Sequence, residues 1–262
     1  MKNILSQILA KKGFIVDMDG VLYHGNKLLP GVKEFVGWLS NEGKKFVFLT
    51  NSSERTPREL KEKLSRLGVE VGEEHFYTSA LATAMFLSSQ KPGGSAYIIG
   101  EAGLINALYN VGYTMNNVNP DYVVMGEART YSYESIEKAV NLVLGGAKLI
   151  GTNPDLSGPI EHGIAPATKA LIAPIEIATG HQAYFIGKPN PLMMRNALKR
   201  LGCIREETII IGDRMDTDIV AGIESEIDTC LVLSGITSID MIEAFAYRPK
   251  YIIAGVNDLL AN

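Results

Sequence analysis

Short runs of apolar and β-branched residues recur along the chain, and stretches whose apolar positions follow a helical period separate them. Runs of this length that are apolar throughout are typical of strands buried on both faces. Strands that alternate with helices form parallel sheets packed between helix layers. The pattern therefore predicts an α/β fold. The expected strands span residues 13–18, 45–50, 96–100, 122–126, 148–152, 183–187, 208–212, 229–234 and 251–254.

Proline and glycine mark the ends of the expected helices. Pro57 begins a stretch with regularly spaced leucines that ends at Gly68, as is typical of proline in a first turn and glycine after a last one. Residues 1–12 form an amphipathic pattern that two lysines close, which is unlike a signal peptide. No later run reaches the ~20 apolar residues that span a bilayer. We therefore expect a cytoplasmic protein.

Composition and charge narrow the class of partner. The chain has 262 residues, 46% of them hydrophobic, and 25 Lys and Arg against 29 Asp and Glu, for a net charge of −4. This length suits one large domain or two small ones. Without a basic field, neither nucleic acid nor a membrane surface is an expected partner. Cys203 and Cys230 stand apart without a metal-ligand spacing, so they indicate buried thiols in a reducing compartment.

Two carboxylates end the first expected strand. Asp17 and Asp19 follow its apolar run, and Gly20 permits a tight turn directly after them. Residues two apart on an extended chain point to the same side, so both carboxylates can face one ligand. The carboxyl ends of parallel strands are where open α/β sheets bind ligands. Taken alone, this segment also fits an acidic loop or half of a calcium loop.

A second acidic segment follows the strand over 208–212. Asp213, Asp216 and Asp218 lie at the expected turn from this strand into a helix. Hard oxygen ligands of this kind suit magnesium, which takes one or two protein carboxylates and bridges to phosphate. For Asp216 we favour a simpler role as the amino-terminal cap of the helix over 219–223.

Polar side chains also follow two further strands. Thr50, Asn51 and Ser52 come at the end of the strand over 45–50, where hydroxyl, amide and backbone N–H groups can bind phosphate oxygens. The same residues could equally form a turn before the next helix. Lys188 follows the strand over 183–187, at the corresponding position, and could neutralise phosphate, although a single lysine is usually solvated.

Together, in this order, the four motifs resemble those of the haloacid dehalogenase-like hydrolase superfamily. The resemblance runs through nearly the whole chain and is strongest to the NagD-like phosphatases, close to p-nitrophenyl phosphatases and nucleotide monophosphatases. It implies a Rossmann-like core with an inserted α/β cap domain of the C2 type. The residues on motif positions are Asp17, Asp19, Thr50, Lys188, Asp213 and Asp218.

The resemblance implies a role for each of these residues. Asp17 would be the nucleophile that becomes an aspartyl phosphate, and Asp19 the general acid and base. A magnesium ion would be held by the Asp17 carboxylate, the Asp19 backbone carbonyl and Asp213, with Asp218 as outer support. The remaining residues would hold the phosphate oxygens. These substrate-binding residues are Thr50, Asn51, Ser52 and Lys188.

The resemblance also implies where the domains divide. The short stretch after the first motif leaves no room for a cap, so the insertion is expected over 81–181, inside a discontinuous catalytic core of 1–80 and 182–262. In this cap, Asn153 and Asp155 follow one strand and Glu127 follows another, and these residues could select the substrate. They could equally form an ordinary strand-end turn.

We therefore expect a magnesium-dependent phosphatase that hydrolyses small phosphomonoesters such as nucleoside monophosphates or sugar phosphates. p-Nitrophenyl phosphate would serve as an artificial substrate. A phosphomutase is the nearest alternative, although its cap usually follows the first motif. A receiver-like phospho-acceptor module is the other, but receivers are about half as long and need no cap. Formation of a homo-oligomer stays open.

Overall fold

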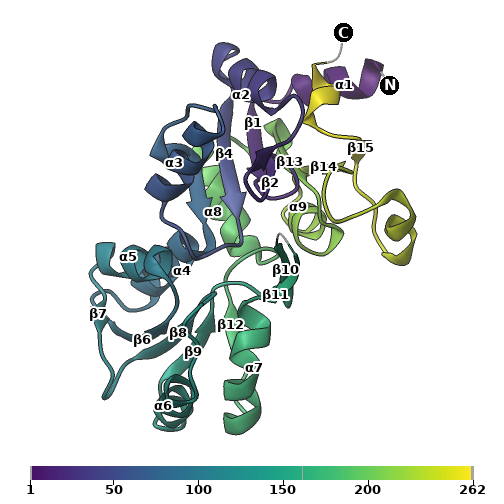
Figure 1. Cartoon of the computed structure of the whole chain (residues 1–262). Helices are drawn as coiled ribbons and strands as arrows, with labels where there is room; N and C mark the ends of the chain where they lie inside the picture. The colour runs from purple at the N-terminus through teal and green to yellow at the C-terminus, as the bar shows by residue number, and fades with distance from the viewer. Residues whose placement is uncertain (1, 161, 261–262) are drawn as a thin grey trace. The chain divides into compact units, whose positions relative to one another are not determined.

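The computed structural model describes residues 2–160 and 162–260, and the chain divides into two compact units. The first unit comprises the chain up to Thr50, Leu60–Tyr77, and the chain from Lys188 onward. The second comprises Asn51–Glu59 and Thr78–Gly187 (Figure 1). Residues 51–59, which directly follow Thr50, thus group with the second unit.

A six-stranded sheet forms the centre of the first unit, in the order β15-β14-β13-β1-β4-β5. The pairs from β15 through β4 are parallel, and Ile15 of β1 lies opposite Ile210 of β13 and Val47 of β4. All five residues of β1 and of β13 are buried, as the uniformly apolar runs predict. The strands are β1 (Gly13–Asp17), β4 (Lys45–Thr50), β5 (Phe76–Thr78), β13 (Thr208–Gly212), β14 (Asp228–Val232) and β15 (Tyr251–Ile253).

Helices cover the two faces of this sheet. Phe14 and Val16 belong to a buried cluster with residues of α1, α2 and α3. Because side chains alternate along a strand, Ile15 faces the other side, where α8 contacts β1 and β4, and α9 contacts β14. These helices are α1 (Lys2–Leu9), α2 (Val32–Asn41), α3 (Pro57–Arg66), α8 (Pro191–Leu201) and α9 (Val220–Glu224), with short helices η1 (Glu73–His75), η2 (Arg205–Glu207), η3 (Met215–Ile219), η4 (Ile239–Ala244) and η5 (Val256–Leu259).

The second unit has its own parallel sheet, in the order β12-β9-β8-β6-β7. Helices α6 and α7 pack on one face, where Ala139 and Ile172 join a cluster with Val123 and Leu149. Figure 1 shows α4 and α5 on the other face. The elements are α4 (Ser79–Gln90), β6 (Ser95–Ile99), α5 (Ala102–Asn110), β7 (Thr114–Met115), β8 (Tyr122–Met125), α6 (Tyr133–Leu144), β9 (Lys148–Gly151), α7 (Thr168–Thr179) and β12 (Tyr184–Phe185).

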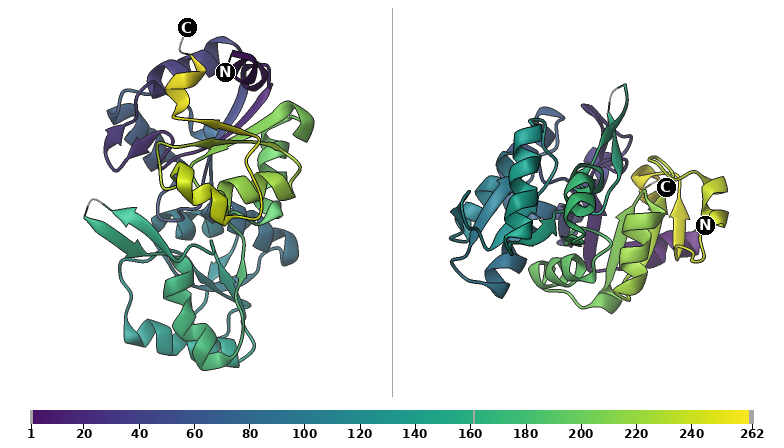
Figure 2. Two further views of the ribbon diagram at one scale, coloured as in Figure 1. Left: turned by 90° about the vertical axis from the view of Figure 1, so that its right-hand side faces the viewer. Right: turned by 90° about the horizontal axis from the view of Figure 1, so that it is seen from below.

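Two short antiparallel hairpins complete the chain. Strands β2 (Tyr23–His24) and β3 (Lys27–Leu28) pair in the loop between β1 and α2. Strands β10 (Ser157–Ile160) and β11 (Gly163–Pro166) form a hairpin that projects from the second unit in Figure 2. Only this small hairpin and its flanking turns lie between the first motif and α2, in the part of the chain that the structure describes.

The predicted α/β fold with parallel sheets and helix layers is confirmed, and all nine predicted strands are present within one or two residues. The short strands β2, β3, β5, β7, β10 and β11 were not predicted, because two to four residues carry too little periodicity. Strand β12 pairs with β9 in the sheet of the second unit. Among residues 2–160 and 162–260, no helix has the length and apolar character that a membrane crossing requires.

The close contact between α9 and the sheet gives a test of the packing. A Cβ atom on Gly222 of α9 would lie 2.4 Å from Thr229 Cγ2 and 2.6 Å from Ile210 Cγ2, whereas one on Gly37 of α2 would meet no atom within 4 Å. We expect Gly222→Ala to lower the free energy of unfolding by about 1–3 kcal/mol through overpacking. Gly37→Ala should raise it by about 0.5–1 kcal/mol through helix propensity. Urea denaturation of both variants checks this, and equal midpoints would contradict the packing described.

Candidate active site

Three neighbouring strands of the first unit end in polar side chains. Because β13, β1 and β4 are adjacent and parallel, Asp213, Asp17 and Thr50 come to the same edge of the sheet. Asp17, Thr50 and Asp213 are 9%, 8% and 2% exposed. Asp19 is exposed, and after it the chain turns back at Gly20, whose N–H donates to the Tyr23 carbonyl at 2.9 Å.

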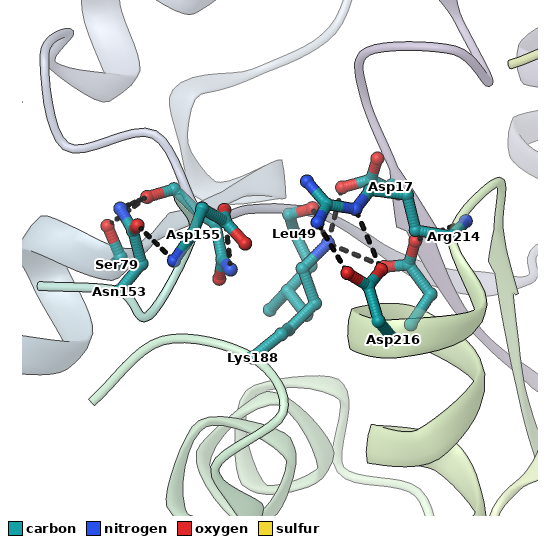
Figure 3. A network of polar contacts seen from close by, with 10 residues as sticks. Asp17, Leu49, Ser79, Asn153, Asp155, Lys188, Arg214 and Asp216 are labelled. Carbon is teal, nitrogen blue, oxygen red and sulfur yellow. Dashed lines mark hydrogen bonds and ion pairs between the residues drawn. The ribbon is translucent and has the colours of Figure 1, made fainter. Parts of the chain in front are cut away.

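Lys188 lies among these carboxylates. Its Nζ donates to Asp17 Oδ1 at 2.5 Å and to Asp218 Oδ1 at 2.6 Å, and lies 3.5 Å from the Leu49 carbonyl (Figure 3). The Lys188 side chain is 3% exposed. Burial acts to lower the pKa of Lys188, but the neighbouring Asp17 and Asp218 charges outweigh it and raise the pKa above its ordinary value. The lysine therefore keeps its positive charge in this site.

The acidic residues form a cluster with the geometry of a metal site. One oxygen each of Asp17, Asp213 and Asp218 lies within 4.8 Å of the others. Burial and the adjacent carboxylates raise the pKa of Asp17 well above its ordinary value and that of Asp213 to about 6. In their ionised forms, the three carboxylates and the one ammonium group carry a net charge of −2 in a buried space, and the raised pKa values reflect the cost of that charge. A divalent cation would neutralise that excess, and oxygen donors suit such an ion.

Glycine residues and backbone N–H groups position these carboxylates. Asp213 Oδ2 accepts the Ile236 N–H at 2.7 Å, and a Cβ on Gly235 would lie 2.0 Å from the same oxygen. A Cβ on Gly212 would lie 2.3 Å from the side chain of Asp218. Only glycine leaves room for the carboxylates at these two places, so the backbone next to them is part of the site.

Asp216 does not have the capping role expected for it. Its carboxylate accepts hydrogen bonds from Nε and Nη2 of Arg214 at 3.0 and 2.7 Å. Asp218 Oδ2 instead accepts the Arg214 N–H at 3.2 Å, where the chain enters the π-helix η3. The prediction was wrong because residues 215–219 form a π-helix that leads directly into α9, so the cap position of α9 is Ile219 and not Asp216.

The second unit contains its own polar cluster, with residues that follow the ends of β8 and β9. Figure 3 shows Ser79, Asn153 and Asp155 of this cluster. Asn51 Nδ2 donates to Asp155 Oδ2 at 3.0 Å. Asn153 is fully buried, and its Nδ2 donates to the Asn51 carbonyl at 2.7 Å and to Glu127 Oε1 at 2.6 Å. Burial raises the pKa of Glu127, although hydrogen bonds from Ser53 and Asn153 act in the opposite direction.

The predicted site residues thus fall into two groups. Asp17, Lys188, Asp213 and Asp218 are in direct contact or within 4.8 Å in the first unit, which also holds Asp19 and Thr50. The second group lies in the second unit and consists of Asn51, Ser52, Asn153 and Asp155.

Two positions have contacts that the motifs alone did not reveal. The segment 234–237 follows the end of β14 and holds Asp213, and Glu127 follows the end of β8. In each case the position at a strand end was the available signal. What the sequence lacked was the identity of the atom that each one contacts.

Comparisons with known proteins agree with this fold. Residues 14–114 match the family described as haloacid dehalogenase-like hydrolase, and residues 185–259 match the HAD-hydrolase-like family. Dihydroxyacetone phosphatase of Corynebacterium glutamicum (strain R) is 47% identical over 246 residues, covering 94% of this chain and 90% of that protein. The chain belongs to the haloacid dehalogenase-like hydrolase superfamily.

Another relative and its solved structure indicate the branch of this superfamily to which the chain belongs. Ribonucleotide monophosphatase NagD of Escherichia coli (strain K12) is 42% identical over 248 residues, covering 95% of this chain and 98% of that protein. The solved structure of NagD from E. coli K-12 superposes with a TM-score of 0.90 at 42% identity, over 95% of this chain and 98% of that one. The chain therefore falls in the NagD-like branch and is an enzyme of the phosphatase class, which confirms the resemblance.

The close approach of Gly235 to Asp213 allows a test of whether this acidic cluster holds a metal ion. We expect Gly235→Ala to push the Asp213 carboxylate out of place and to weaken the binding of Mn²⁺ by about tenfold or more. Isothermal titration calorimetry with Mn²⁺ measures this without reference to turnover. Gly37→Ala, whose new Cβ meets no atom within 4 Å, is the matched control. An unchanged Mn²⁺ affinity in Gly235→Ala would show that Asp213 does not hold the ion.

Proposed function

We propose that the protein is a magnesium-dependent phosphomonoester hydrolase that works through an aspartyl phosphate on Asp17. The observation that carries this proposal is the buried contact of Asp17 with Lys188 beside two further carboxylates. Such a cluster keeps a nucleophile next to positive charge and away from bulk water. Phosphoryl transfer depends mainly on this kind of positioning and charge stabilisation.

In the first step, a carboxylate oxygen of Asp17 attacks phosphorus, and the bond from phosphorus to the leaving oxygen breaks. Lys188 already holds Asp17 Oδ1 at 2.5 Å, so it fixes the nucleophile and offsets the charge that gathers around phosphorus. Thr50, Asn51 and Ser52 would bind the oxygens of the transferred group through their hydroxyl, amide and N–H groups.

The exposure of Asp19 supports its proposed role as the general acid. It is exposed, two residues from the buried nucleophile, so it can exchange protons with solvent. It would protonate the leaving oxygen and then take a proton from the water that hydrolyses the aspartyl phosphate.

Asp17, the Asp19 carbonyl and Asp213 would hold magnesium, with Asp218 in support. When bound, the ion would supply positive charge to the phosphate oxygens and to the nucleophile. The two negative charges that Lys188 leaves uncompensated support a divalent ion.

Two free cysteines, Cys203 and Cys230, support a reducing, cytoplasmic location.

We further propose that the first unit is the catalytic core and that the second is a cap that selects among substrates. Relatives named dihydroxyacetone phosphatase and ribonucleotide monophosphatase support small sugar phosphates or nucleoside monophosphates as the substrate class. In that cap, Asp155 is a candidate for contact with the leaving group.

Phosphate release from a panel of phosphomonoesters, with magnesium and with EDTA, tests the proposal. The panel contains nucleoside monophosphates, sugar phosphates and p-nitrophenyl phosphate. We expect release to require magnesium and to fall by about 10³-fold or more in Asp17→Asn, which replaces the nucleophile by an amide of the same shape. Stable labelling of Asp17 without turnover would favour the receiver-like alternative, and phosphate return to a sugar would favour a phosphomutase.

The role of Asp19 is tested by leaving groups of different basicity. We expect Asp19→Asn to slow the hydrolysis of a sugar phosphate more than that of p-nitrophenyl phosphate, by about tenfold or more, because a weakly basic leaving oxygen needs less help from an acid. Steady-state kcat/KM values for both substrates give the comparison. Equal losses on the two would argue against Asp19 as the acid.

A further inference from the structure

The peptide that joins Asn51 to Ser52 is held by its carbonyl oxygen. That oxygen accepts a hydrogen bond from Ser79 Oγ at 2.5 Å and a second from Asn153 Nδ2 at 2.7 Å. Ser79 and Asn153 are both fully buried. Two buried donors on one carbonyl oxygen fix the plane of this peptide.

Fixing the carbonyl also fixes the N–H on the other side of the bond. In a trans peptide the N–H points opposite to the C=O. The Ser52 N–H therefore points away from Ser79 and Asn153. This is one of the groups proposed above to bind the phosphate of the substrate.

Glu127 accepts hydrogen bonds from Asn153 and from Ser53, the residue that follows this peptide. Its Oε1 accepts Asn153 Nδ2 at 2.6 Å, and its Oε2 accepts the Ser53 N–H at 3.0 Å and the Ser53 hydroxyl. Asn153 thereby uses both amide hydrogens, one on the Asn51 carbonyl and one on Glu127. A side chain that accepts at both ends at once must be a carboxylate, because a carboxamide has only one acceptor atom.

We propose that Glu127 is a positioning residue for phosphate binding, which fixes the Asn51–Ser52 peptide through Asn153 and Ser53 so that the Ser52 N–H is presented to the substrate. The proposal deepens the proposed function and rests on it. It assigns Asn153 to this positioning network, since both of its amide hydrogens are used there.

Glu127→Gln tests the proposal with almost no change in shape. Whichever way the carboxamide turns, its NH₂ faces either Asn153 Nδ2 or the Ser53 N–H, so one donor meets another in a buried place. We expect the KM for p-nitrophenyl phosphate and the inhibition constant of inorganic phosphate to rise together by about tenfold. The kcat should change much less, because this N–H would bind ground state and transition state alike.

Glu176→Gln is the matched control. Glu176 also lies in the second unit and accepts a backbone N–H, that of Ala183 at 2.7 Å, but it makes no contact with Asn51, Ser52 or Ser53 among the hydrogen bonds of the described residues. We expect it to keep the KM and the phosphate inhibition of the unchanged protein. Glu127→Asp, which keeps two acceptor oxygens on a shorter side chain, should show a smaller rise than Glu127→Gln and serves if that variant does not fold.

The outcomes separate this inference from the proposed function. If the unchanged protein hydrolyses p-nitrophenyl phosphate and is inhibited by inorganic phosphate, the proposed function stands and the variants decide the rest. Unchanged phosphate inhibition in the Glu127 variants, with or without a lower melting temperature, overturns the positioning role. The positioning role is also overturned if the loss of activity in these variants depends on the leaving group of the substrate while inhibition by inorganic phosphate stays constant.

Discussion

The structure depends above all on keeping like charges together in a place that excludes water. Asp17, Asp213 and Asp218 are each 9% exposed or less, and their oxygens lie within 4.8 Å. Such an arrangement is unfavourable unless opposite charge is supplied. Lys188 supplies part of it from within the chain, and its own burial is tolerated only because these carboxylates surround it. Asp17 and Lys188 thus stabilise each other's charged forms.

The remainder of the first unit provides a rigid frame for this charge cluster. Strands β1 and β13 are buried along their whole length, so their ends cannot shift without disturbing the core. Gly212 at the end of β13 and Gly235 after β14 lie so close to the carboxylates of Asp218 and Asp213 that no larger residue fits there. The position of a functional side chain is defined best when it lies on a rigid, packed strand or helix and its neighbours allow only one conformation. The second unit applies the same principle with hydrogen bonds, where Glu127 and Asn153 fix a peptide through its carbonyl oxygen.

The sequence determined a large part of this arrangement. A buried parallel strand needs apolar residues at every position, and this local requirement makes such strands visible as uninterrupted runs. The first polar residue after a run then marks a strand end, where ligands bind in open α/β sheets. Asp17, Thr50 and Asp213 follow from these two rules alone. Their assignment to particular catalytic roles needed the resemblance to a known superfamily as well.

Only the tertiary structure decided which strands pair and which polar side chains contact each other when they lie far apart in the sequence. The sequence shows that β12 is a strand, but its pairing with β9 depends on which edge is available in the folded chain. Likewise, the sequence places Asp216 and Asp218 in one acidic segment but does not show their contacts. In the structure Asp218 accepts a hydrogen bond from Lys188 Nζ, whereas Asp216 accepts one from the Arg214 side chain. The sequence marks Glu127 as a polar residue at a strand end, but its contact with Ser53, 74 positions away, is visible only in the folded chain. The periodicity of apolar residues indicates where strands and helices form, because each needs a particular pattern of buried positions. The hydrogen-bond partner of a polar atom, in contrast, depends on the path of the whole chain.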